Sequence, residues 1–213
     1  MQVRLNLGRV QLDGILELPP GVKSVVVFAH GSGSSRLSPR NNYVARVLRE
    51  AGLGTLLFDL LTGEEDRDYR NRFDIGLLAE RLAAATGWLL GQAGNLVSLG
   101  YFGASTGAAA ALQASVERPE VRAIVSRGGR PDLAADCLGS IRAPTLLVVG
   151  GRDEEVLTLN RQALVRIPAE KGLTVIPGAT HLFEEPGALE EVTRAAASWF
   201  GRFLECANRG RSP

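Results

Sequence analysis

The fold of this 213-residue chain is decided by the stretch Gly100-Tyr-Phe-Gly-Ala-Ser105-Thr-Gly-Ala-Ala-Ala-Ala111. The run Leu96–Gly100, which leads into this stretch, is apolar apart from one serine. Such a run is typical of a strand buried on both faces of a parallel sheet. Residues 107–116 have helical periodicity. A serine between them, with a glycine two positions before and two after, predicts a tight strand-to-helix turn that exposes the Ser105 hydroxyl. The G-x-S-x-G string alone is weak, because it also fits a turn that merely contains serine.

The same kinds of pattern alternate along the whole chain. Residues 3–7 and 10–18 alternate polar and apolar side chains and predict an opening antiparallel hairpin. Further apolar runs predict parallel strands at Ser24–Phe28, Gly54–Phe58, Val121–Ser126, Thr145–Val149 and Leu173–Ile176. Helical periodicity recurs at Asn41–Ala51, Asp74–Leu90, Gly107–Val116, Val156–Arg166 and Leu189–Leu204. We therefore expect an α/β fold with a mostly parallel, doubly wound sheet of about eight strands and helices on both faces.

Composition sets the class of protein. The length suits one core, so we expect a single domain over residues 1–207 and a disordered C-terminal tail over 208–213. A formal net charge of +1 argues against a nucleic-acid partner. No apolar run is long enough to span a membrane, and no signal peptide is visible, so we expect a cytoplasmic protein. Two cysteines, Cys137 and Cys206, are too few for a disulfide framework or a zinc cluster, and we expect no metal and no cofactor.

The residues that suggest chemistry follow the predicted strands, at the edge where such sheets bind ligands. His181 is one of only two histidines, and it lies between the last predicted strand and the last helix. Asp153 follows the strand Thr145–Val149, so the chain order is Ser105, Asp153, His181, the order of this fold class. We expect Ser105 to be a nucleophile, His181 its base, and Asp153 the acid that orients the base. Glu154, Glu155 and Asp59 are weaker candidates for the acid, since each also fits a helix start or a turn.

A glycine-rich loop, His30-Gly-Ser-Gly-Ser34, follows the first parallel strand. Such a loop can turn a backbone N–H toward a substrate carbonyl oxygen, and we assign this oxyanion donor to Ser32, with Gly31 or Gly33 as alternatives. The N–H of Thr106 supplies the second donor, and Gly31 is also a candidate substrate contact. We expect His30 to brace the loop. The loop lacks the lysine and spacing of a phosphate-binding motif.

Four segments resemble the dienelactone-hydrolase-like branch of the α/β hydrolases: Phe28–Ser35, Gly100–Ala108, Pro144–Asp153 and Pro177–Phe183. The resemblance implies acyl transfer through a covalent acyl-enzyme, without a cofactor. True dienelactone hydrolases use a cysteine nucleophile, whereas position 105 is serine, so an ester or thioester of a small molecule is the expected substrate. Ser126-Arg-Gly-Gly-Arg-Pro-Asp132 is similar to a subgroup of hydrolases of which some are fused to phosphoribosyltransferase domains. No such domain is present in this chain.

Two features of the sequence bear on substrate recognition. About 18 residues separate the strands ending at Ser126 and starting at Thr145, which leaves no room for a lid domain and predicts an open site. Arg127 and Arg130 could bind an anionic substrate group, or could instead pair with Asp132 or Asp136.

The densely charged segment 64–72 fits a solvated loop able to fold over one side of the pocket. The oligomeric state is not readable. A peptidase, a perhydrolase or a non-catalytic binding protein of the same fold remain alternatives.

Overall fold

The structure is a computed structural model that describes residues 1–92 and 98–205. The expected tail at 208–213, Cys206, and the start of the strand expected from Leu96 lie outside these described residues. Among the described residues, none of the helices combines the length and apolar character that a membrane crossing requires.

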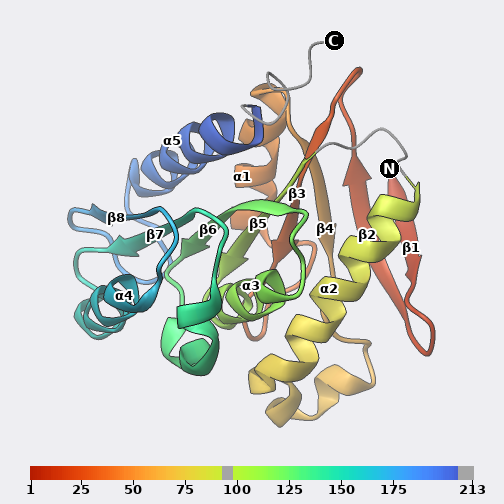
Figure 1. Cartoon of the computed structure of the whole chain (residues 1–213), viewed down its shortest axis with the longest axis horizontal. Coiled ribbons are helices and arrows are strands. Elements are labelled where there is room, and N and C mark those ends of the chain that lie inside the picture. Colours follow the sequence, from red (N-terminus) through yellow and green to blue (C-terminus); the bar gives the residue numbers. More distant parts are fainter. Residues whose placement is uncertain (93–97, 206–213) are drawn as a thin grey trace.

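A single eight-stranded sheet forms the centre of the described chain (Figure 1). Its order is β1-β2-β4-β3-β5-β6-β7-β8. Strand β2 pairs antiparallel with β1 and β4, and all other neighbours pair in parallel, as the sequence predicts. The strands are β1 (Gln2–Asn6), β2 (Gln11–Glu17), β3 (Ser24–Ala29), β4 (Gly54–Phe58), β5 (Ser98–Ala104), β6 (Val121–Arg127), β7 (Thr145–Gly150) and β8 (Lys171–Ile176).

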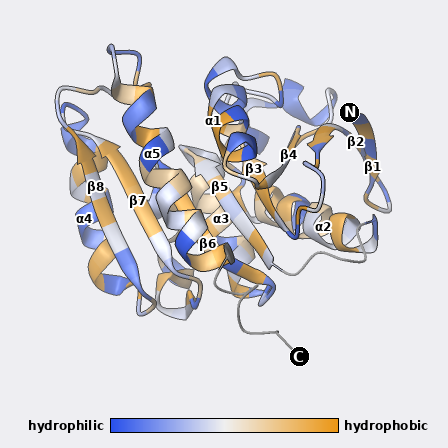
Figure 2. Ribbon diagram, turned by 90° about the horizontal axis from the view of Figure 1, so that it is seen from above, coloured by the Kyte–Doolittle hydropathy of each residue, from blue (hydrophilic) through white to orange (hydrophobic). Residues whose placement is uncertain are grey.

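Helices cover both faces of this sheet. The α-helices are α1 (Pro39–Glu50), α2 (Ile75–Gln92), α3 (Thr106–Val116), α4 (Glu154–Arg166) and α5 (Ala188–Phe200). Helices α1 and α5 pack on one face with Phe28 and Phe102, and α2 and α3 pack on the other with Tyr101. The strands are largely hydrophobic in Figure 2, as expected for a sheet buried on both sides.

The connections contain shorter helical turns. The 3₁₀ turns are η1 (Glu65–Arg67), η2 (Tyr69–Phe73) and η3 (Pro131–Ser140), and a π-helical turn, η4 (Gly201–Glu205), follows α5. The prediction of one α-helix as far as Leu204 is therefore wrong in its last turn. Helix α5 ends at Phe200, and the hydrogen bonding changes from α to π after it. The segment expected to be a loop at 64–72 is largely 3₁₀.

The strand register brings the predicted functional segments to one edge. Ala29 at the end of β3 is level with Gly103, and Ala104 is level with Arg127 at the end of β6. Further along the sheet, Gly150 at the end of β7 is level with Ile176 at the end of β8. The loops that follow β3, β5, β6, β7 and β8 therefore leave the sheet side by side.

Candidate active site

Ser105 occupies the turn between β5 and α3 in a backbone conformation that L-residues rarely adopt, with φ 52° and ψ −120°. Its neighbours have no room for a side chain. A Cβ on Gly103 would lie 2.4 Å from Ala108 Cα, and one on Gly107 would lie 2.2 Å from the carbonyl oxygen of Ala29. The two glycines are thus required by close backbone approach, as the sequence predicts. Ser105 is the N-cap residue of α3, but its hydroxyl does not cap the helix.

His181 and Asp153 are in direct contact. The Nδ1 atom of His181 lies 2.6 Å from Oδ2 of Asp153, which is short for a hydrogen bond and indicates a charge-assisted one. With its proton on Nδ1 facing the carboxylate, the imidazole presents Nε2 as the acceptor. The two loops are tied together, since the Arg152 N–H donates to the Ala179 carbonyl at 2.9 Å.

The end of β6 joins the serine turn to the histidine loop. The Ser105 N–H donates to the Arg127 carbonyl at 3.2 Å. The next residue, Gly128, has a φ of 52°, and a Cβ there would lie 3.4 Å from Cε1 of the His181 ring. The structure therefore brings the three predicted residues to one place. No hydrogen bond of the Ser105 hydroxyl is formed within the described residues, and such contacts commonly tighten only when substrate binds.

The His30–Ser34 loop packs directly on the serine turn. A Cβ on Gly31 would lie 3.1 Å from Cβ of Ser105, so only glycine fits there without displacement. The Ser32 N–H donates to the Thr106 hydroxyl oxygen at 2.9 Å. His30 links two loops: Nε2 accepts from the Leu60 N–H at 3.0 Å, and Nδ1 donates to the Gly31 carbonyl at 3.0 Å. Burial lowers the pKa of His30, which favours this neutral, bracing form.

No family model matches the chain. The crystal structure of a dienelactone hydrolase from Anabaena variabilis is 55% identical to it, with a TM-score of 0.92, and the alignment covers 96% of this chain and 97% of that one. This chain belongs to the dienelactone-hydrolase-like branch of the α/β hydrolases. Est1E from Butyrivibrio proteoclasticus, solved with ferulic acid bound, has a TM-score of 0.82 at 17% identity, over 95% of this chain and 99% of Est1E, and so shares the fold.

A longer relative is also similar to this chain. A Mycobacterium tuberculosis protein that carries the provisional name phosphoribosyl transferase is 60% identical over 201 residues. The match covers 93% of this chain and 45% of the relative, so this chain spans less than half the length of that protein.

Arg127 and Arg130, for which the sequence allows either an anion-binding role or an ion pair, have different surroundings. Arg130 forms a two-point ion pair with Asp132, at 2.9 and 2.7 Å, so its charge is already matched. Arg127 is only 9% exposed, its Nη1 atom has no partner within the described residues, and Arg40 is a neighbouring charge. Burial and that charge lower the pKa of Arg127 to about 10, so the guanidinium stays protonated at neutral pH.

The alternative acids occupy other places. Asp59 accepts the Arg36 N–H at 2.7 Å and pairs with the Arg36 guanidinium, which fixes the loop after β3. Glu154 and Glu155 lie in the first turn of α4, where their negative charge suits the helix dipole. Of the acids considered, Asp153 alone contacts His181 within the described residues.

A narrow hollow with an enclosed volume of about 10 Å³ lies beside the serine turn. The sequence indicated its polar side, formed by His30, Gly31, Ser32, Gly33 and Thr106, but missed the side formed by Leu60, Leu61, Asp66, Arg72 and Leu78. The position of Leu60 and Leu61 just after a buried strand was the available signal.

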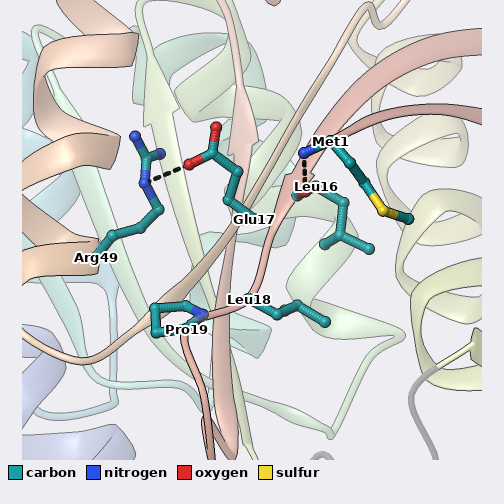
Figure 3. Close-up of a pocket in the computed structure, with 6 residues that line it drawn as sticks. All are labelled: Met1, Leu16, Glu17, Leu18, Pro19 and Arg49. Atoms are coloured by element: carbon teal, nitrogen blue, oxygen red, sulfur yellow. Dashed lines mark hydrogen bonds and ion pairs between the residues drawn. The ribbon is translucent and has the colours of Figure 1, made fainter.

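A more open hollow of about 480 Å³ lies elsewhere, lined by Met1, Leu16, Glu17, Leu18, Pro19 and Arg49 (Figure 3). Because Glu17 pairs with Thr55 near the start of β4, this hollow lies at the opposite end of the sheet from Ser105. Arg49 Nε already pairs with Glu17 at 2.8 Å across it. Its residues therefore take no part in the candidate active site.

Proposed function

We propose that this hydrolase cleaves an ester or thioester bond of a small molecule through a covalent acyl-enzyme on Ser105. The observation that carries the proposal is the 2.6 Å contact between His181 Nδ1 and Asp153 Oδ2, next to a serine in a strained strand-to-helix turn. A carboxylate on Nδ1 fixes the tautomer in which Nε2 can take a proton from the serine hydroxyl.

The proposed reaction has two halves. In the first, the Ser105 oxygen attacks the acyl carbon while His181 Nε2 takes the hydroxyl proton, and the carbonyl oxygen becomes an oxyanion. The Thr106 N–H at the start of α3 is the proposed oxyanion donor. The Ser32 N–H, to which the sequence assigned the same role, already donates to the Thr106 hydroxyl. His181 then protonates the departing alcohol or thiol, which leaves the acyl group on Ser105.

In the second half, His181 removes a proton from water, and the resulting hydroxide attacks the acyl carbon. Collapse of this intermediate returns the proton from His181 to the serine oxygen and releases the carboxylic acid. Asp153 stays ionised and stabilises the imidazolium in both halves.

Arg127 is the proposed contact for an anionic group on the substrate, because a buried guanidinium favours a bound anion and this one has no carboxylate partner among residues 1–92 and 98–205. Its carbonyl oxygen already contacts the Ser105 N–H. Arg130 suits this role less, since Asp132 neutralises it. An Arg127→Met variant should lose turnover of anionic esters more than of neutral ones, whereas Arg130→Met should affect both equally.

A fluorophosphonate probe tests the central proposal. The folded protein should be labelled on Ser105, as located by mass spectrometry, and Ser105→Ala should not be labelled. A panel of nitrophenyl esters and acyl thioesters then measures turnover. Labelling at another residue, or no labelling of folded protein, would contradict the proposal.

A further inference from the structure

The narrow hollow beside Ser105 has no assigned role. From its lining, we infer that it is the acyl subsite of the hydrolase and that it takes short, uncharged acyl chains. This inference rests on the proposed acyl-enzyme mechanism and names the substrate class for it.

Ser105 does not itself line the hollow, but two residues in contact with it do. Gly31 and Thr106 line it, and both directly adjoin the serine: Gly31 packs against the Ser105 side chain, and Thr106 is the next residue. The opposite side is apolar, formed by Leu60 and Leu61 after β4 and by Leu78 from α2. An acyl carbon held between the two sides would direct its chain onto these leucines.

The charged residues of the hollow already satisfy one another. Arg72 binds both carboxylate oxygens of Asp66, through Nε and Nη2, each at 2.8 Å. The two ring nitrogens of His30 are engaged by the Leu60 N–H and the Gly31 carbonyl. Among the described residues, the charged groups that line the hollow are paired with each other. A charged acyl group would therefore lose its hydration without compensation, so the hollow favours a neutral chain.

Size sets the limit on chain length. The enclosed space of the hollow is about 10 Å³, enough for one water-sized group, whereas pockets that hold drug-sized ligands measure roughly 300–1,000 Å³. The Asp66–Arg72 ion pair lines this space, and Arg72 Nη1 lies 3.9 Å from the Cβ position of Gly33. An acetyl methyl group should therefore be accepted far better than a butyryl or octanoyl chain.

The test uses nitrophenyl acetate, butyrate and octanoate with matched variants. Arg72→Ala removes part of the charged lining, and Arg70→Ala is its control, since the Arg70 side chain lies in the same turn, is 89% exposed and does not line the hollow. Leu78→Ala widens the apolar side. We expect kcat/KM of the wild type to favour acetate over octanoate by at least about tenfold, and Arg72→Ala and Leu78→Ala to reduce that preference about tenfold.

The outcomes separate the two levels of inference. If Ser105 is labelled by the fluorophosphonate and the esters are hydrolysed, but the octanoate preference is the same in wild type, Arg72→Ala and Leu78→Ala, the acyl subsite is wrong and the hydrolase function stands. If Arg70→Ala changes the preference as much as Arg72→Ala, the subsite is equally wrong. Failure to label Ser105 in folded protein would overturn both.

A separate observation concerns Thr106, a residue that is 2% exposed and whose hydroxyl oxygen accepts the Ser32 N–H at 2.9 Å. A hydroxyl that accepts one hydrogen bond still has one proton to donate, and this proton has no acceptor within the described residues. The geometry points to the Thr106 hydroxyl as a further catalytic residue that donates to the oxyanion on Ser105. The Ser32 amide then acts through this hydroxyl, polarising it.

Thr106→Val removes the hydroxyl at nearly constant shape, and Thr106→Ser retains it. If the proposed esterase function holds, Thr106→Val should lower kcat by about 10²-fold with little change in KM, because one oxyanion donor is lost, and Thr106→Ser should restore most of it. Thr106→Ala gives a second removal if the valine variant unfolds. Unchanged kcat in both removals, or a loss confined to KM, would show that the hydroxyl only fixes the loop.

Discussion

The packing of Gly107 makes the most direct test of the serine turn. A Cβ at this position would lie 2.2 Å from the Ala29 carbonyl oxygen and 2.4 Å from that of His30, whereas ordinary contacts begin near 3.4 Å. In Gly107→Ala the backbone of α3 or the end of β3 must therefore move by about 1 Å. Neither moves freely, because β3 is paired on both sides, with β4 and β5.

Overpacking of a fixed site costs about 3 kcal/mol or more. For a chain of this length, 1 kcal/mol lowers Tm by roughly 2–4 °C, so Gly107→Ala should melt about 6–12 °C below the wild type. The same displacement moves the His30–Ser34 loop away from Ser105, so labelling by a fluorophosphonate should slow as well. Thermal melting and labelling rates, both recorded on the folded variant, measure the two effects.

Gly139 provides the control, because a Cβ there meets nothing within 4 Å and its backbone has a negative φ. Gly139→Ala should change stability by no more than about 1 kcal/mol and leave the labelling rate unchanged. A Gly107→Ala protein that melts and labels like the wild type would refute the steric account of the turn.

Three further expectations concern other parts of the chain. Asp153→Asn should lower ester turnover by roughly 10³–10⁴-fold without unfolding the protein, because His181 loses the carboxylate that fixes its tautomer; steady-state kinetics beside a thermal melt will check this. Thr86→Val should cost about 1–3 kcal/mol in urea denaturation, since it strands the buried Tyr101 hydroxyl that lies 2.7 Å from the threonine oxygen. Because burial lowers the pKa of His30 below 6.5, the unfolded chain takes up a proton first as pH falls; the free energy of unfolding should therefore decrease from pH 6.5 downward, and His30→Asn should lose that dependence.

Much of the fold could be predicted because the parallel strands are short, continuously apolar runs. Gly54–Phe58 is predicted to the residue, since its run is bounded by glycine and aspartate. The end of β5 is less readable: the strand continues to Ala104, because Tyr101 and Phe102 are buried on opposite faces and Gly103 has no room for a side chain.

In the candidate site, only the features that depend on residue order and spacing could be predicted from the sequence. Spacing could not separate Asp153 from Glu154, because one residue decides whether a carboxylate precedes α4 or lies in its first turn. Arg127 and Arg130 looked alike in the sequence, and only the strand register buries Arg127. The Asp66–Arg72 pair depends on two successive 3₁₀ turns, which leave no periodic pattern to detect.

Backbone groups take part in each of the contacts described around Ser105: the Arg127 carbonyl accepts from its amide, Gly31 lies against its side chain, and the Ser32 amide donates to the Thr106 hydroxyl. Groups held in this way keep their orientation whether or not anything is bound, so the entropy of arranging them is lost once, when the chain folds. A covalent inhibitor should consequently attach to Ser105 without reshaping these loops. On heating, the ability to react with it should disappear together with the sheet, in one transition.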